Sequence, residues 1–120
     1  MPINPPPHID PATLMPAWAM TIINAHTSVT AAVSHGKRIK SDRYFCWQED
    51  DDNDLLADNG HAESGMTGYT DLFTKKEFDN WGRQLEAAFD AAGISWQRTG
   101  ITYEQDTGFF HWSWDWEVFG

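Results

Sequence analysis

The chain has 120 residues and a formal net charge of -10, from 18 acidic and 8 basic side chains. This length fits one domain, and the 41% apolar content, with seven Trp and seven Phe, is typical of a globular chain. The acidic surplus argues against wrapping nucleic acid through counterion release, and no apolar run reaches the ~18–20 residues that span a bilayer. The opening residues, MPINPPPHID, do not have the pattern of a secretory signal. A single cysteine, Cys46, excludes an internal disulfide and a cysteine zinc cage.

Prolines divide the N-terminal part from a single domain that we expect over residues 12–120. All six prolines lie within residues 1–16, so residues 1–11 are predicted to be an extended arm, either a frayed terminus or a docking arm. A helix is predicted from Thr13, because apolar residues recur there at helical spacing. The shared face consists of Leu14, Trp18, Ile22 and Ala25. The β-branched residues that follow predict a strand over 27–33.

The middle of the chain reads as two strands on either side of an acidic loop. After the turn at His35 and Gly36 comes a basic stretch that contains Lys37, Arg38, Lys40 and Arg43. Residues 43–48 (RYFCWQ) predict a largely buried strand, and residues 66–73 predict the next one. Between them, residues 49–60 read EDDDNDLLADNG, which predicts a solvated acidic loop.

A second helix is predicted from a capping box. Thr74 and Glu77 have the spacing at which a hydroxyl and a carboxylate satisfy the first free amides of a helix. Apolar residues continue at helical spacing, at Phe78, Trp81, Leu85, Ala88 and Ala92. Gly93 stands where a left-handed C-terminal cap is expected.

The last quarter predicts a long β-hairpin, with strands over 94–103 and 109–119 and a turn over 104–108. The return strand alternates strictly. One face is formed by Phe110, Trp112, Trp114, Trp116 and Val118, and the other by His111, Ser113, Asp115 and Glu117. The order of elements predicts an α+β fold. Its sheet would be mainly antiparallel or mixed, with four to five strands and two helices packed on one face.

The polar residues form no catalytic or metal-binding pattern. Asp50, Asp52 and Asp54 alternate like the first ligands of a calcium loop, but Leu55 stands where that loop needs glycine, and His61 where it needs glutamate. The five histidines show no metal-ligand spacing. There is no GxSxG nucleophile motif and no phosphate-binding glycine loop. We therefore expect no enzyme activity, no cofactor and no metal.

The tryptophans of the WSWDWE stretch allow two interpretations. Strand alternation places Trp112, Trp114 and Trp116 together on one face, opposite the carboxylates of Asp115 and Glu117. We expect these three, with Trp81, to form the core beneath the helices, where each buried aromatic contributes about 2–3 kcal/mol. The alternative is an exposed aromatic platform for a partner or ligand.

Three segments in order carry a family resemblance. They are YFCWQEDDDNDLLADN (44–59), TGYTDLFTKKEFD (67–79) and GISWQRTGITYEQDTGFFHWSWDWEV (93–118). A strand leads into an acidic loop, an aromatic-Thr-Lys step opens the second helix, and a Gly-Ile-x-aromatic turn begins the final hairpin. In these features the chain resembles the tail-terminator proteins of siphophages, which complete the tail and join it to the head. The resemblance covers residues 41–119.

The resemblance implies a non-enzymatic α+β subunit of a six-membered ring that caps the finished tail tube and joins the head connector. The protein would belong to the virion, at the head-proximal end of the tail, and would assemble in the host cytoplasm. Its partners would be copies of itself, the tail tube protein and the connector protein, with DNA passing through the hole without specific binding.

In such a ring, the acidic loop and the basic stretch would each have a role. The acidic loop would face the lumen or a neighbouring ring, where it would repel phosphate. It contains Glu49, Asp50, Asp51, Asp52, Asp54 and Asp58. The basic residues Lys37, Arg38, Lys40 and Arg43 would contact a neighbouring subunit, because opposite charges across an interface fix its register.

Two other functions fit the composition. A small acidic protein that mimics DNA and inhibits a host nucleic-acid-binding or defence protein would have the same size and charge. A carbohydrate-binding module would use exposed tryptophans. The DNA mimic gives no reason for the three segments that occur in the order of the family.

Overall fold

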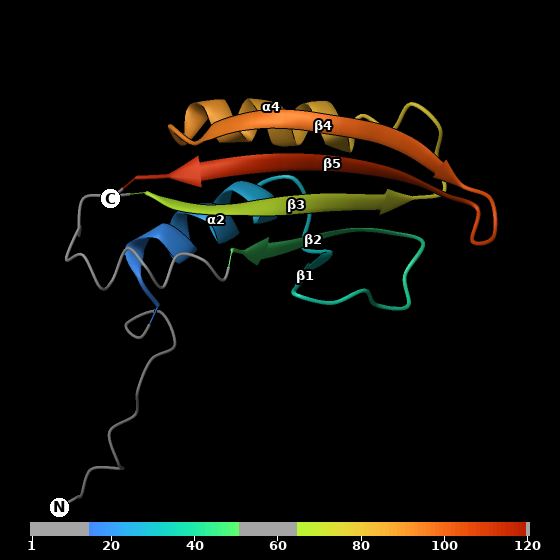
Figure 1. Cartoon of the computed structure of the whole chain (residues 1–120), viewed down its shortest axis with the longest axis horizontal. Helices are drawn as coiled ribbons and strands as arrows, with labels where there is room; N and C mark the ends of the chain where they lie inside the picture. Colours follow the sequence, from blue (N-terminus) through green and yellow to red (C-terminus); the bar gives the residue numbers. More distant parts are fainter. Residues whose placement is uncertain (1–14, 51–64, 120) are drawn as a thin grey trace, which may run out of the picture.

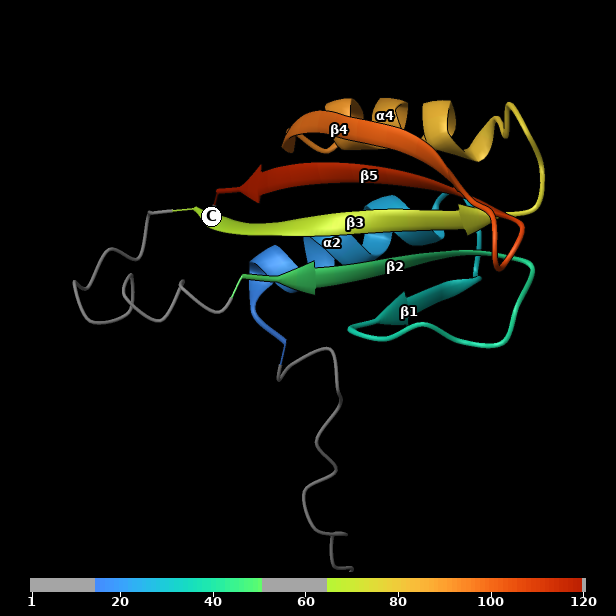
Figure 2. The same ribbon diagram turned by 45° about the vertical axis from the view of Figure 1, so that its right-hand side comes forward.

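The computed structural model describes residues 15–50 and 65–119. They form a mixed five-stranded sheet with two helices packed on one face (Figures 1 and 2), so the predicted α+β class and terminal hairpin are confirmed. The elements are α2 (Ala17–Thr27), β1 (Val33–His35), β2 (Arg43–Glu49), β3 (Met66–Thr74), α4 (Trp81–Ala91), β4 (Ser95–Glu104) and β5 (Phe109–Val118). The strand order is β1-β2-β3-β5-β4, and among these only β1 and β2 pair in parallel. The predicted arm over residues 1–11 lies outside the described residues.

The first helix ends later than the sequence predicts. α2 continues to Thr27, and the amides of Ser28 and Thr30 then donate to the Asn24 and His26 carbonyls at its C-terminal end. The predicted strand over 27–33 is therefore wrong for most of its length, because helix-end carbonyls take up the amides that a strand would need. Only the three residues of β1 pair with the sheet.

The second helix begins later than the sequence predicts, and the capping box is not formed. Thr74 is the last residue of β3, and its hydroxyl donates to Oδ2 of Asp79 at 2.6 Å. Glu77 is exposed. The helix starts at Trp81, whose amide donates to Oδ1 of Asp79 at 2.9 Å. Asp79 thus provides the acceptor that was assigned to the capping box. The helix ends at Ala91, and Gly93, which has φ +74°, stands just beyond it as the predicted left-handed cap.

The core lies between the sheet and the two helices. Trp112, Trp114 and Trp116 are all buried on this face of β5, and Trp81 packs against the cluster from α4. The helices contribute Ile22, Leu85 and Phe89, each fully buried. Gly82 allows the close approach of α4, because a Cβ atom there would lie 2.3 Å from the Trp112 ring.

The opposite face of the sheet, here called the open face, is covered by neither of the two described helices. A small cluster of Tyr44, Cys46 and Phe73 is buried there. The Cys46 thiol donates to the Lys37 carbonyl at 3.3 Å, and burial raises the pKa of this thiol. Such a thiol stays protonated and is a poor nucleophile. Neither described helix is long and apolar enough to cross a membrane.

Candidate interaction surfaces

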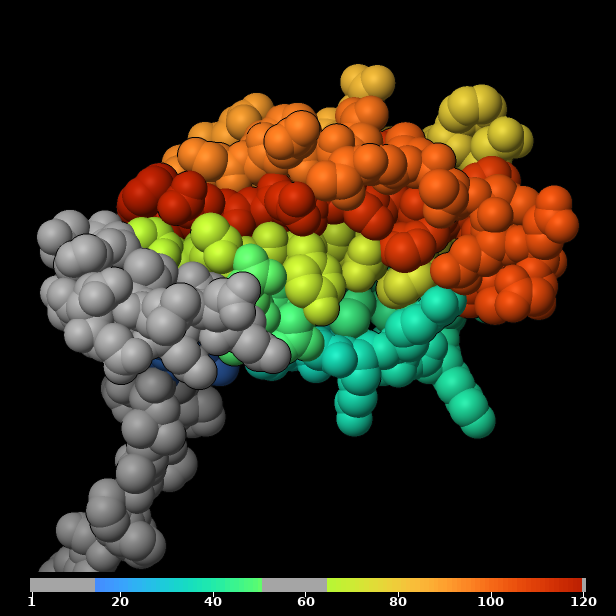
Figure 3. Space-filling view, in the orientation of Figure 1, coloured from blue at the N-terminus to red at the C-terminus, as the bar shows by residue number. Residues whose placement is uncertain are grey.

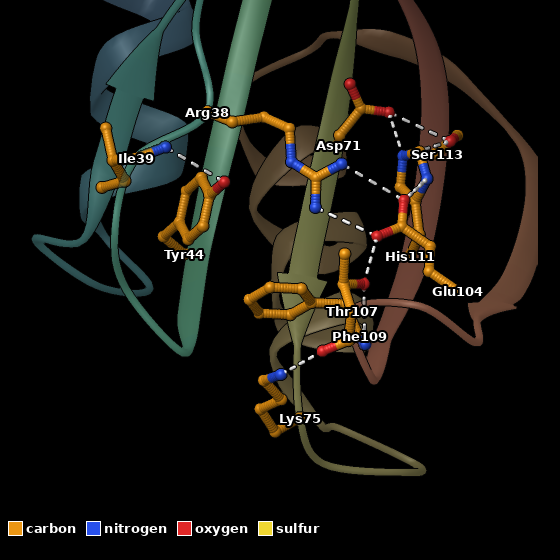
Figure 4. Close-up of polar contacts among 10 residues, drawn as sticks. All are labelled: Arg38, Ile39, Tyr44, Asp71, Lys75, Glu104, Thr107, Phe109, His111 and Ser113. Carbon is orange, nitrogen blue, oxygen red and sulfur yellow. Dashed lines mark hydrogen bonds and ion pairs between the residues drawn. The ribbon is translucent and has the colours of Figure 1, made fainter.

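Polar side chains from β3 and β5 cluster on the open face (Figure 4). Nε2 of His111 lies 2.8 Å from Oδ1 of Asp71, and the Ser113 hydroxyl donates to the same oxygen at 3.0 Å. Because a carboxylate only accepts, Nε2 carries the proton. The same nitrogen is 3.3 Å from Ser113 Oγ, so it has no lone pair with which to accept that hydroxyl's proton. A Ser-His-Asp relay uses two different ring nitrogens; this cluster instead links the two strands.

Arg38, one of the predicted interface residues, is engaged within its own chain (Figure 4). Its Nη2 and Nη1 lie 3.0 Å and 3.3 Å from the two carboxylate oxygens of Glu104, and its guanidinium lies 3.9 Å from the centroid of the Phe73 ring. The hydrogen bond from Arg38 lowers the pKa of Glu104. Such a bidentate ion pair fixes the relative orientation of the two side chains and also pairs their charges. It fastens the segment between β1 and β2 to the end of the hairpin.

Arg43 is also paired internally. Its guanidinium donates twice to the carboxylate of Asp79 and lies 3.7 Å from the centroid of the Trp81 ring. Lys37 and Lys40 are exposed and make no ion pair among the described residues. Of the four basic residues predicted at a subunit interface, Arg38 is also exposed, but only the two lysines have no ion pair among the described residues.

The described part of the acidic loop lies at one end of the sheet. Glu49 accepts from His35 at 2.7 Å, and Asp50 accepts from the Thr67 hydroxyl at 2.8 Å. A shallow hollow at this end is lined by Asp50 together with Asp115 and Glu117 of β5. The other residues predicted to form the acidic surface lie outside the described residues: Asp51, Asp52, Asp54 and Asp58.

Phe78, in the turn before α4, combines exposure with an unusual backbone. Its side chain is 89% exposed, and its φ of +60° lies in the left-handed region, which costs a non-glycine residue about 1–2 kcal/mol. The neighbouring Asp79 is 1% exposed and accepts hydrogen bonds from Arg43, Thr74 and the Trp81 amide. This anchored carboxylate fixes the turn and leaves the phenyl ring in solvent.

Phe78 borders a groove of about 510 Å³ between the turn and the β4–β5 hairpin. Ile101 and Tyr103, which are 46% and 53% exposed, line the same groove. We call Phe78, Ile101 and Tyr103 the knob surface. Beneath it, the indole nitrogen of Trp112 is buried without a hydrogen-bond partner among the described residues. Grouped, exposed aromatic and aliphatic side chains of this kind are typical of protein–protein contacts.

Phe78→Gly tests whether the Phe78 side chain contributes to the stability of the fold. The variant loses little burial and removes the left-handed penalty, while the added freedom of glycine in the unfolded chain costs about 0.5–1 kcal/mol. We expect the free energy of unfolding to stay unchanged or to rise by up to about 1 kcal/mol, as measured by urea denaturation. A clear loss of stability would mean that the ring supports the fold.

A second apolar groove, of about 560 Å³, lies between α2 and the β1–β2 edge. Trp18 and Trp47 meet edge to face in it, with their ring centroids 6.4 Å apart. Ile23 and Val33 complete its wall, and Met15, at its rim, is 39% exposed. We call these five residues the α2 groove. Its lining is mainly aromatic and aliphatic, with Thr27, His35 and Glu49 as its polar members, and it is therefore suited to an apolar side chain.

Sequence reasoning missed both surfaces. It placed Phe78 on the core face of a helix because the ring fits the 3.6-residue spacing with Trp81 and Leu85. An available signal was Asp79-Asn80, two residues that favour the start of a helix, directly before Trp81. The α2 groove has no local signal, because Trp18 and Trp47 come from separate elements.

Comparison with known proteins gives no further guide. No model of a known protein family matches the chain, and neither does a curated protein or a solved structure. A functional assignment therefore depends on these surfaces and on the three sequence segments that resemble the family.

Proposed function

We propose that the protein is a ring-forming structural subunit of the siphophage tail-terminator kind, which closes the tail tube and joins it to the head connector. The observation that carries the proposal is the position of the two apolar surfaces. The knob surface lies beside β4, and the α2 groove lies beside β1, at the opposite edge of the sheet. A contact between unlike surfaces is heterologous, and repeated contacts of this type close into a ring when the rotation permits.

The three segments that resemble the family support the proposal through their place in the sheet. Residues 44–59 include most of β2, residues 67–79 include most of β3, and residues 93–118 supply the β4–β5 hairpin. These four strands are neighbours in the order β2-β3-β5-β4. The described parts of these segments thus form one continuous structural unit, and the α+β fold is the one that the family implies.

The acidic end of the sheet is proposed to face the passage for DNA. Asp50, Asp115 and Glu117 line the same hollow. Carboxylates repel phosphates, so a lumen lined in this way would let a duplex move without gripping it.

The decisive experiment mixes the purified protein with cognate tail tubes that lack a terminator and examines them by negative-stain electron microscopy. We expect an annular density at one end of each tube and none along its wall. Tube ends that remain bare at saturating protein would contradict the proposal. Binding along the tube wall would contradict it as well.

The acidic hollow also favours one alternative, a mimic of DNA that occupies the basic site of a host protein. Such a mimic would compete with duplex DNA for that host protein, and its binding would weaken steeply with salt. It would leave tube ends bare. Electron microscopy of the tubes therefore separates the two functions.

A further inference from the structure

Phe78 is presented as a fixed, solvent-exposed ring on an anchored turn. The segment between β3 and α4, in yellow, projects at the upper right of Figure 3. The ring is 89% exposed although its backbone is strained, and Asp79 beside it is fully engaged in hydrogen bonds. A rigid aromatic side chain loses little conformational entropy on binding, and this is a property of the residues that dominate protein interfaces. Strain held at an exposed aromatic points to a binding role.

The α2 groove has the chemistry and the size to receive this ring. Two tryptophans and two aliphatic side chains line it, and aromatic rings pack well edge to face against tryptophan. Its volume of about 560 Å³ exceeds that of one phenyl ring, so a neighbouring side chain such as Ile101 or Tyr103 would enter with Phe78.

The charges beside the two surfaces are opposite in sign. Around Phe78, the exposed cations Lys75, Lys76 and Arg83 outnumber the exposed carboxylate of Glu77. The buried charge of Asp79 is balanced by Arg43. Glu49 lines the α2 groove, where its carboxylate accepts from His35. Complementary charge of this kind orients two partners as they meet.

The two surfaces cannot meet within one chain, because they lie at opposite edges of one sheet. Figures 1 and 2 both show the start of α2 at the lower left and the turn before α4 at the upper right. We infer that the Phe78 ring of one copy inserts into the α2 groove of a second copy, so that the subunits join head to tail. This inference rests on the proposed ring and names its subunit contact.

Mixing two variants tests the contact directly. Phe78→Asp removes the knob and keeps the groove, whereas Met15→Asp with Trp18→Ala damages the groove and keeps the knob. We expect each variant alone to have a self-dissociation constant raised at least about 30-fold, the usual effect of losing a hot-spot residue. An equimolar mixture should restore one intact contact and give heterodimers but no larger species in analytical ultracentrifugation.

Matched controls separate this result from a loss of folding. Phe119→Asp alters another exposed phenylalanine, 59% exposed and distant in sequence from the turn, and should assemble as wild type. Phe78→Gly should fold normally, yet assemble as poorly as Phe78→Asp. Circular dichroism of each variant, and heterodimer formation itself, verify that the damaged surfaces belong to folded proteins.

The outcomes distinguish this inference from the proposed function. Rings of Phe78→Asp on tube ends would overturn the subunit contact and leave the terminator function standing. Association through Phe78 without any binding to tubes would support the subunit contact and overturn the terminator function. A wild-type protein that remains monomeric at millimolar concentration and on tubes would overturn both. If Phe78→Asp assembles normally and a peptide of residues 1–14 shifts the tryptophan fluorescence, the groove belongs to that segment instead.

Discussion

Arg43→Ala is expected to lower the free energy of unfolding by about 3–5 kcal/mol. Arg43 donates two hydrogen bonds to Asp79, whose side chain is completely buried, and stacks over Trp81. Without the guanidinium, a buried carboxylate keeps only the hydroxyl of Thr74 and the amide of Trp81 as partners. Urea denaturation at pH 7 measures the loss. A change below about 1 kcal/mol would show that water replaces the guanidinium, as happens for exposed pairs.

A double-mutant cycle separates the ion pair from the stacking on Trp81. Asp79→Ala alone should also be strongly destabilising, but Arg43→Ala with Asp79→Ala should cost clearly less than the sum, because no unpaired buried charge remains. Additive effects would mean that the two side chains stabilise the turn independently.

The pH dependence gives a second signature of the same pair. Burial alone would raise the pKa of Asp79, but the hydrogen bonds from Arg43, Thr74 and the Trp81 amide more than offset it, and the pKa lies below its ordinary value. The stabilisation is therefore present above the unfolded pKa of about 3.9 and is lost as pH falls through the folded pKa. The difference in stability between wild type and Arg43→Ala should shrink as the pH is lowered from 6 towards 3.

This pair also gives Arg43 a structural role within its own chain, although its basic surroundings suggested an interface residue. Arg43 was predicted to contact a neighbouring subunit, because it stands in a basic stretch. In the structure it fixes Asp79, which in turn fixes the backbone of Phe78. Loss of Arg43 would loosen the knob surface, so in the proposed assembly its charge would act through the shape of the turn.

Local patterns predicted the elements that depend on local physics. Five successive alternations in β5 identified its buried face, because side chains on a strand point alternately to opposite sides. Gly93 marked a helix end, since a left-handed residue without Cβ costs little there. The α+β class followed from the order of such elements.

Features that depend on partners distant in sequence were not predictable in this way. The capping box had the right spacing, but Thr74 is held in the sheet and donates to Asp79. The parallel pairing of β1 with β2 needs only three residues and left no periodic signal. Arg38 and Glu104 are 66 positions apart, so the local sequence around either residue does not predict their ion pair. The candidate surfaces depend on the same long-range placement.

A buried chain of hydrogen bonds under α2 fixes the protonation state of His26. The indole nitrogen of Trp116 donates to the Thr70 hydroxyl at 2.9 Å, and that hydroxyl lies 2.9 Å from Nε2 of His26. Nδ1 of His26 lies 2.7 Å from the Ile22 carbonyl oxygen, which only accepts, so Nδ1 carries the proton. Nε2 is then the acceptor for the Thr70 hydroxyl. The imidazole is neutral and fully satisfied, and a second proton would leave the Thr70 hydroxyl hydrogen without its partner.

Acid is therefore expected to destabilise the fold through His26. Burial lowers the pKa of His26 from 6.5 to about 4, although the hydrogen bond to Ile22 opposes the shift. The unfolded chain binds the proton more readily, so stability is complete above pH 6.5 and falls as the pH drops towards 4. A shift of this size corresponds to about 3 kcal/mol. Urea midpoints measured between pH 7 and pH 4.5 should report most of this loss.

His26→Leu supplies the control, because it removes the titrating group and keeps an apolar side chain of similar size. The variant leaves the Thr70 hydroxyl without its acceptor, which costs about 1–3 kcal/mol at every pH. Its stability should therefore be lower than that of wild type at pH 7 but should change much less between pH 7 and pH 4.5. An equally steep pH dependence in both proteins would assign the acid sensitivity to the carboxylates, and the buried histidine would then have no part in it.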